Sequence, residues 1–164
     1  MKRYQDYEEP HIDTHISILY EQHDDFANFL REKIRSFNNE HSLHHRESRQ
    51  KGAVRPLHLI VTDQHQQWVG GLTAEVYWGW VEIHKFWFHE EYRGKGLGSK
   101  LLAQAEIAAQ EMGANKALLT TYSFQARTFY EERGYQVVGE IKDYPPGSSY
   151  YTMVKPFDAE EGCL

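Results

Sequence analysis

The sequence predicts one α/β domain with a mixed, mostly antiparallel sheet of about six to seven strands. A chain of 164 residues has the length of an ordinary single domain. Seven short runs of β-branched and aromatic residues are typical of strands, and longer stretches repeat apolar residues at helical spacing. Because strands and helices alternate only in the second half, a mixed sheet is favoured over a doubly wound parallel one.

The first third of the chain is predicted to be a strand followed by a helix. Residues 12–20 gather β-branched and apolar side chains as a strand does. Residues 24–38 repeat apolar positions at helical spacing, and Asp24 and Asp25 suit the positive end of a helix dipole. The polar residues 39–54 are either an extension of this helix or a loop.

Three strands, 57–62, 68–77 and 81–88, come next, and the links between them are short. This spacing predicts an antiparallel meander. A helix over 97–112 follows, with Gly113 at the position that closes its C-terminus.

The last part of the chain is predicted to contain three strands and a short helix. The helix covers 124–133, with Ser123 as its cap, and a turn over 143–147 joins the final two strands. The strands cover 117–121, 135–141 and 150–154. We expect one domain over residues 1–157 and a flexible tail over 158–164.

Composition excludes several classes of protein. Twenty-four acidic against 18 basic residues give a formal charge of −6, which argues against a nucleic-acid partner. Cys163 is the one cysteine, so it forms no intramolecular disulfide and suits a reducing compartment. The sequence shows no signal peptide and no apolar run of membrane length, so a cytoplasmic protein without a membrane partner is expected.

The chain contains ten histidines, and three of them invite a metal hypothesis. His41, His44 and His45 share one helical face, but they lack a spaced catalytic signature, and a solvated polar face explains them better. No required metal is predicted.

The most informative stretch is a basic, glycine-rich turn between the strand over 81–88 and the helix over 97–112. Its sequence is Arg93-Gly94-Lys95-Gly96-Leu97-Gly98. Such a turn lets several N–H groups and a helix N-terminus converge on an anion, which indicates a phosphate-bearing ligand. It fits neither the dinucleotide fingerprint nor the P-loop. A glycine-rich turn with no ligand is the alternative.

This turn resembles the Arg/Gln-x-x-Gly-x-Gly/Ala signature of the GNAT N-acetyltransferase superfamily. A second stretch, 123–135, resembles the family pattern Asn-x-x-Ala-x-x-x-Tyr-x-x-x-Gly-Phe, with Ser123 in place of the asparagine. Together the motifs cover residues 81–135. The resemblance implies a twisted sheet that splays between its fourth and fifth strands, with about four helices on both faces.

The resemblance also implies acetyl-coenzyme A as cosubstrate and a set of contacts for it. The free edge of the fourth strand would hold the pantetheine arm through Phe86, Trp87 and Phe88. The turn would hold the pyrophosphate through Arg93, Gly94, Lys95, Gly96, Leu97, Gly98 and Ser99, and Ser123 would add a further contact.

Each step of acetyl transfer has a candidate residue. Tyr130 falls on the family tyrosine beside the coenzyme sulfur, where a phenol could protonate the thiolate, and the Phe88 N–H could stabilise the oxyanion. For the base, Glu82 is the first candidate, and His84 could act alone or relay the proton, with Glu75 as a third option. On a regular strand Glu82, His84, Phe86 and Phe88 share one face, although a bulge would change that parity. The alternatives are a core tyrosine and solvated strand residues.

The predicted activity is transfer of an acetyl group to a primary amine of a small molecule, by direct attack in a ternary complex. A protein or peptide acetyltransferase and a non-catalytic acyl-coenzyme A sensor are the rivals. Glu75 and Glu82 with the rings of Tyr77, Trp78, Trp80 and Trp87 could form an acidic aromatic cleft for a cationic amine, or these rings could be core. A homodimer through edge strands is a further expectation.

Overall fold

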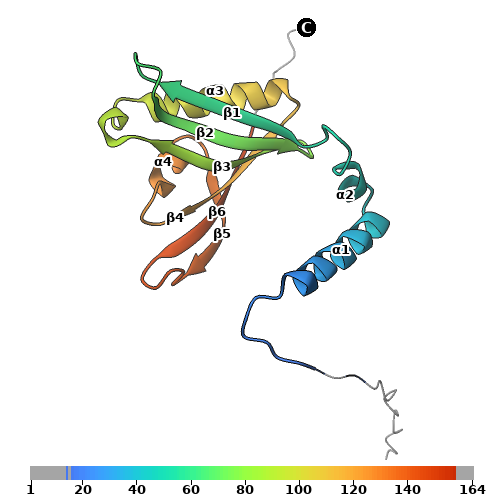
Figure 1. The fold of residues 1–164 in the computed structure, drawn as a ribbon. Coiled ribbons are helices and arrows are strands. Elements are labelled where there is room, and N and C mark those ends of the chain that lie inside the picture. Colours follow the sequence, from blue (N-terminus) through green and yellow to red (C-terminus); the bar gives the residue numbers. More distant parts are fainter. Residues whose placement is uncertain (1–13, 15, 158–164) are drawn as a thin grey trace, which may run out of the picture.

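The computed structural model describes residue 14 and residues 16–157, and the expected C-terminal tail lies outside this part of the chain. Six strands form one sheet in the order β1-β2-β3-β4-β6-β5. They are β1 (Arg55–Thr62), β2 (Trp68–Tyr77), β3 (Trp80–Phe88), β4 (Lys116–Tyr122), β5 (Gln136–Lys142) and β6 (Ser149–Pro156). Only β3 and β4 pair in parallel, so the expected mixed, mostly antiparallel sheet is confirmed (Figure 1).

The described chain has four α-helices and one short 3-10 helix. They are α1 (Asp24–His41), α2 (Leu43–Glu47), η1 (Glu90–Tyr92), α3 (Leu97–Glu111) and α4 (Arg127–Glu131). None of the helices in this part of the chain has the length and apolar content that crossing a bilayer requires.

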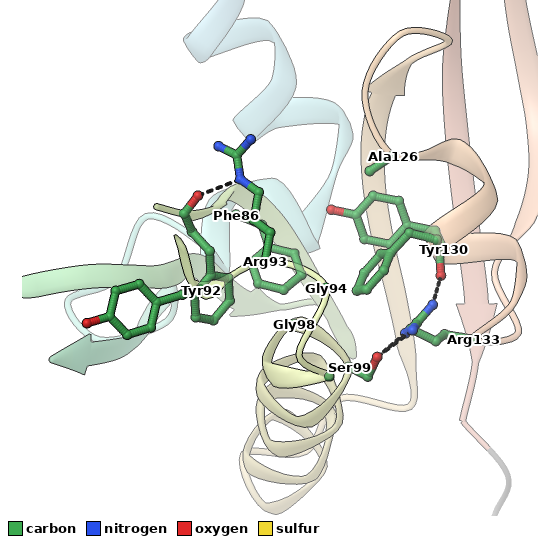
Figure 2. Close-up of a pocket in the computed structure, with 12 residues that line it drawn as sticks. Phe86, Tyr92, Arg93, Gly94, Gly98, Ser99, Ala126, Tyr130 and Arg133 are labelled. Atoms are coloured by element: carbon green, nitrogen blue, oxygen red, sulfur yellow. Dashed lines mark hydrogen bonds between the residues drawn. The ribbon is translucent and has the colours of Figure 1, made fainter. Parts of the chain in front are cut away.

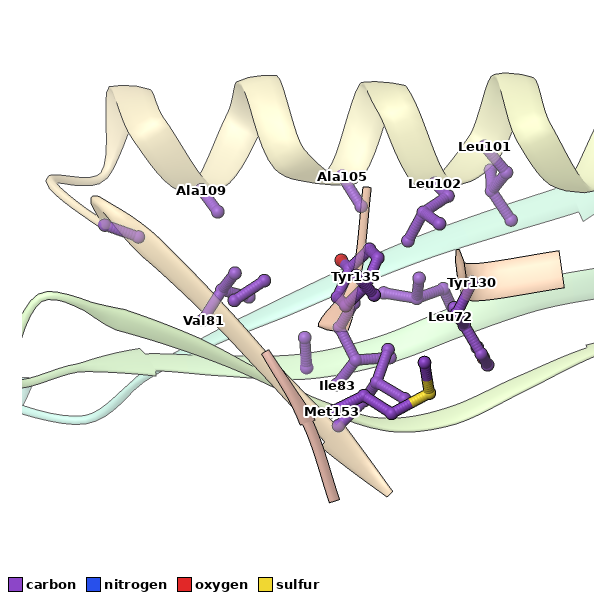
Figure 3. Close-up of a cluster of buried hydrophobic side chains, with 14 of the residues drawn as sticks. Leu72, Val81, Ile83, Leu101, Leu102, Ala105, Ala109, Tyr130, Tyr135 and Met153 are labelled. Carbon is purple, nitrogen blue, oxygen red and sulfur yellow. The ribbon is translucent and has the colours of Figure 1, made fainter. Parts of the chain in front are cut away.

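Helix α3 lies along one face of β1–β3 and seals the core (Figure 1). Four of its side chains point at the sheet, namely Leu101, Leu102, Ala105 and Ala109 (Figure 3). They pack against Leu72, Val81 and Met153, all of which are buried. Burial of each large side chain stabilises the fold by about 1.5–3 kcal/mol, so this face holds the helix in place.

The N-terminal arm departs from expectation. The strand predicted over 12–20 is wrong for residues 16–20, which form no strand; the other described residue of that range, Thr14, is not in a strand either. The chain there leads away from the sheet, and a strand forms only where a neighbouring strand accepts its hydrogen bonds. Helix α1 forms as predicted, and none of its residues is buried, so it does not contribute to the core (Figure 1).

Helix α2 accounts for part of the uncertain polar segment 39–54. It sits at the turn between β2 and β3, where the Trp78 indole N–H donates to the His44 carbonyl oxygen at 3.2 Å. The Trp78 ring also contacts the His45 ring edge-on, with centroids 4.9 Å apart. The histidines of this segment therefore hold a structural contact, and the described residues contain no group of three metal-ligating side chains close enough to bind an ion.

The sheet opens between β3 and β4. These two strands pair only from Trp80 to Ile83 and from Lys116 to Leu119, and beyond this point they diverge. The divergence begins at a β-bulge, because Ile83 pairs with Ala74 and Lys85 with Thr73, which leaves His84 as the extra residue. The predicted splay between the fourth and fifth strands of the sequence is the gap between β3 and β4.

Candidate functional site

The glycine-rich turn is shaped by two left-handed glycines. Gly94 and Gly96 have φ values of 69° and 77°, a region that other residues rarely adopt. A Cβ added at either would meet no protein atom within 4 Å, so the turn borders open space. Gly98 serves another purpose, because its Cβ would lie 3.4 Å from the Phe129 ring. Two glycines therefore shape the turn, and the third lets α3 start close to α4.

Two arginines fix this turn from both sides (Figure 2). The Arg93 Nε donates to the Phe88 carbonyl oxygen at 2.8 Å, which ties the turn to the end of β3. The Arg133 guanidinium, at the end of α4, donates through its Nε to the Ser99 hydroxyl at 3.0 Å. Ser99 lies in the first turn of α3, so Arg133 joins α4 to the helix N-terminus.

A cavity of about 440 Å³, here called the glycine-turn cavity, lies between these elements. Its walls are Phe86, Phe88, Tyr92, Arg93, Gly94, Gly96, Gly98, Ser99, Ala126, Phe129, Tyr130 and Arg133. Two guanidiniums and the N-terminus of a 15-residue helix border it and supply positive charge. Aromatic rings lie among these groups, and the Arg133 guanidinium is 3.8 Å from the centre of the Phe129 ring. The cavity therefore suits a ligand with an anionic and an apolar part.

The backbone of β3 turns two peptide groups toward the splay. The His89 N–H donates to the Val69 carbonyl oxygen at 2.8 Å, so Gly70 and Phe88 form a pair without mutual hydrogen bonds. Hydrogen-bonded and non-hydrogen-bonded pairs alternate along an antiparallel ladder. Phe86 and Phe88 therefore turn their N–H and C=O groups away from β2, whereas Trp87 turns its own groups toward β2. The free N–H groups at the splay therefore belong to Phe86 and Phe88.

A second cavity of about 750 Å³, here called the splay cavity, fills the opening between β3 and β4. It shares Phe86, Arg93, Ala126 and Tyr130 with the glycine-turn cavity, so the two meet at these residues. Its further walls come from β3, from β4 and the turn that follows it, and from the start of β6.

Tyr130 stands where the cavities meet. Its ring is 7% exposed and contacts Phe86, Phe129 and Tyr135. Burial raises the pKa of Tyr130 to about 12, because the apolar surroundings disfavour the phenolate. Within the described residues its hydroxyl has no hydrogen-bond partner, so the proton is available to a ligand.

The candidate bases occupy two different pairs. The Tyr77 hydroxyl donates to the Glu82 carboxylate, and this hydrogen bond raises the pKa of Tyr77 to about 12. Glu82 borders neither cavity. His84 borders the splay cavity, and its Nε2 lies 3.4 Å from a Glu75 carboxylate oxygen. The structure thus brings the His84–Glu75 pair, rather than Glu82, to the splay.

The predicted common face of Glu82, His84, Phe86 and Phe88 is wrong, because the bulge at His84 reverses the side-chain alternation of β3. Val81 and Ile83 face the core before the bulge, and Phe88 is the buried residue beyond it. For the same reason Trp87 faces away from the glycine-turn cavity and is 56% exposed.

Three more residues predicted to contact the coenzyme lie outside the glycine-turn cavity. The Lys95 Nζ is 5.9 Å from the centre of the Tyr92 ring, and Leu97 packs against the core. Ser123 does not cap α4, whose N-cap is Ala126; its hydroxyl accepts the Ser149 N–H at 3.1 Å.

Sequence reasoning missed four cavity residues, namely Tyr92, Ala126, Phe129 and Arg133. Ala126 belongs to the quoted motif, and that motif alone could have indicated it. No local sequence pattern indicates Arg133, because its partner Ser99 is 34 positions away.

The expected acidic aromatic cleft does not form. Trp78 is held by α2, and the Lys116 ammonium covers the Trp80 ring at 5.1 Å. Tyr77 is bonded to Glu82. Each of these side chains is held by its own contact, and they do not line a shared cavity.

Comparison with known proteins agrees with this geometry. A model of the acetyltransferase (GNAT) family matches residues 17–135. The chain belongs to the GNAT family. It is therefore an acyltransferase of that family, and members of the GNAT family use acetyl-coenzyme A.

Two relatives show how far the similarity extends. The blasticidin-S acetyltransferase of Streptomyces morookaense is 38% identical over 106 residues, which cover 62% of this chain and 78% of that protein. An acetyltransferase of Agrobacterium fabrum is 29% identical over 103 residues, which cover 63% of this chain and 75% of that protein.

Solved structures share the fold of this GNAT chain. An acetyltransferase from Bacillus cereus superposes with a TM-score of 0.72 at 26% identity, covering 86% of this chain and 98% of that one. A candidate streptothricin acetyltransferase of Bacillus anthracis, in complex with acetyl-coenzyme A, gives a TM-score of 0.56 at 23% identity over 74% and 72% of the two chains.

Proposed function

We propose that this GNAT protein transfers an acetyl group from acetyl-coenzyme A to a primary amine of a small molecule, in a ternary complex. The observation that carries the proposal is the junction of the two cavities at Tyr130. A donor in one cavity and an acceptor in the other would meet at this hydroxyl. The relative named for acetylation of blasticidin S supports a small-molecule acceptor.

The residues present fit the donor. Gly94 and Gly96 leave open space beside the turn, and Arg93 and Arg133 border the same cavity. These groups would hold the pyrophosphate, and the Phe86 and Phe88 peptide groups at the splay would hold the pantetheine arm. Acetyl-coenzyme A supplies the activated acyl group. Ser99, bonded to Arg133, would keep that guanidinium in position.

Three groups of the chain would serve the transfer. In the reaction the amine nitrogen forms a bond to the carbonyl carbon of the acetyl group, and the carbon–sulfur bond then breaks. The Phe88 N–H stabilises the negative charge that develops on the carbonyl oxygen. The Tyr130 hydroxyl, protonated at neutral pH, donates its proton to the departing sulfur. His84, with Glu75 on its Nε2, accepts the proton that the amine loses.

A turnover assay tests the proposal. The protein is incubated with acetyl-coenzyme A and a panel of small amines, with a lysine peptide as the rival acceptor, and free thiol and product mass are recorded. We expect thiol release that depends on a small amine and a product heavier by one acetyl group. Acetylation of the peptide alone would favour the rival, and coenzyme binding without any turnover would favour a sensor.

A further inference from the structure

The far end of the splay cavity is lined by aromatic rings that the core does not use. Tyr122 at the end of β4 stacks on Phe124 in the following turn, with centroids 5.1 Å apart and planes 8° from parallel. Tyr150 at the start of β6 lies 4.8 Å from Tyr122. Tyr144, in the turn between β5 and β6, meets Tyr150 edge-on at 6.0 Å. We call these four residues the aromatic cluster.

The cluster is open to a ligand. Tyr122, Phe124 and Tyr150 border the splay cavity, and Phe124 is 63% exposed. Within residues 16–157, the hydroxyls of Tyr122, Tyr144 and Tyr150 make no hydrogen bond to another group. The side chains of Phe124 and Tyr144 are exposed and those of Tyr122 and Tyr150 are half-buried, so the cluster offers both a stacking surface and polar contacts.

Local hydrogen bonds hold the cluster in shape. The Ser123 N–H donates to the Ser149 carbonyl oxygen at 2.8 Å, and the Ser149 N–H donates to the Ser123 hydroxyl at 3.1 Å. This pair joins the turn that carries Phe124 to the strand end that carries Tyr150. Ser123 is therefore a positioning residue of the cluster.

The charges of the splay cavity restrict what can bind there. His84, Lys85 and Arg93 are the cationic or imidazole side chains in its wall, and no carboxylate of the described residues borders it directly. A polyamine would place several positive charges near Lys85 with no carboxylate of the described residues in the wall to compensate them, which is unfavourable. A ligand with one amine and an uncharged planar part avoids this repulsion.

We propose that the aromatic cluster is a subsite for a planar aromatic or heteroaromatic ring of the acceptor, with the reacting amine extending toward Tyr130. This inference rests on the proposed function, since it names the class of acceptor for the same site. The cavity volume of about 750 Å³ is within the range of small-molecule sites. The ring would stack beside Tyr122 and Phe124.

Binding of two matched amines tests the subsite without requiring catalysis. Phenethylamine and cyclohexylethylamine carry the same amine arm and six-carbon rings, but only the first ring is planar. Calorimetry on the coenzyme A-bound protein measures both affinities. We expect phenethylamine to bind about tenfold more tightly, because aromatic pairs gain energy beyond buried area. Equal affinities would overturn the subsite.

Two variants test whether the preference for the planar ring arises at the aromatic cluster. Phe124→Ala removes an exposed ring and should abolish the preference, whereas Ile107→Ala, 57% exposed on α3 and outside both cavities, should retain it. A preference that persists in Phe124→Ala would overturn the assignment to the cluster.

Turnover of the same amines separates the two proposals. If neither these amines nor any amine of the panel is acetylated but the ring preference and its loss in Phe124→Ala are observed, the cluster still binds an aromatic ring and the proposed function is contradicted. If both amines are acetylated and bound equally well, the function stands and the subsite falls.

Discussion

The two cavities that meet at Tyr130 are built in different ways. The glycine-turn cavity draws its walls from two stretches of chain, 86–99 and 126–133. The splay cavity takes its walls from β3, β4, the turn after β4, α4 and β6, which pairing of distant strands brings together. Two continuous stretches of chain thus shape the proposed donor side, and pairing of distant strands shapes the proposed acceptor side.

Because the two cavities are built from different parts of the chain, coenzyme affinity and acceptor preference should be changed by different substitutions. Changes in the glycine turn should alter coenzyme affinity and leave acceptor preference intact. Changes in the aromatic cluster should do the reverse. Tyr130 borders both cavities, and its hydroxyl is proposed to act only in the transfer step. Removal of this hydroxyl should therefore lower turnover and leave the affinities for coenzyme and acceptor nearly unchanged.

The largest effect is expected from Gly96→Val. The new side chain would occupy the space beside the turn and weaken coenzyme binding at least about 100-fold, as measured by calorimetry. Gly113→Val is the matched control, because Gly113 also has a positive φ, 89°, with open space around it, but lies at the far end of α3. Equal affinity in the two variants would remove the turn from the coenzyme site.

Tyr130→Phe should lower kcat about 100-fold and leave the Kd for coenzyme A nearly unchanged, because only the hydroxyl is lost. The raised pKa keeps the phenol protonated, so the wild-type rate should not fall as pH passes about 10, the ordinary pKa of tyrosine. An unchanged kcat in the variant would assign Tyr130 to the core alone.

His84→Gln should lower kcat about tenfold with saturating acceptor, since His84 borders the splay cavity and Glu75 holds its ring. Glu82→Gln is the comparison variant and should change kcat little, because Glu82 lies outside both cavities. A larger loss in Glu82→Gln than in His84→Gln, measured across a pH series, would reverse the assignment.

Arg133→Gln should weaken coenzyme binding about fivefold, because one cation beside the pyrophosphate is lost. Arg127→Gln, in α4, is the control: Arg127 pairs with Glu131 at 2.9 Å and borders neither cavity. The affinities are compared at low and high salt, where a smaller salt dependence in Arg133→Gln is expected. Indistinguishable affinities of the two variants would take Arg133 out of the donor side.

The sequence predicts the glycine-rich turn and the elements on either side of it, because this part of the structure is local. The turn Arg93–Gly98 is contiguous, and the strand before it and α3 after it have clear periodicities. Apart from the N-terminal arm, the predicted strands and helices are confirmed within a few residues, with α4 shorter than expected.

Long-range packing determines the features that the sequence does not predict. The bulge at His84 depends on the register between β2 and β3, and it moves Trp87 away from the predicted contacts. The pairing of Arg133 with Ser99 depends on how α4 meets α3. The strand-like pattern over 12–20 carries no information about which edge would receive it, and residues 16–20 lie away from the sheet. Each of these features is set by tertiary contacts rather than by local propensity.

The central claim is that the glycine-turn cavity binds coenzyme A, and thermal unfolding with acetyl-coenzyme A, coenzyme A and NAD in parallel tests it most directly. Both coenzyme A forms should raise the unfolding temperature, with about 2.7 kcal/mol of stabilisation at 100 times the Kd, and NAD should have no effect. An unchanged unfolding temperature with both coenzyme A forms would contradict the account.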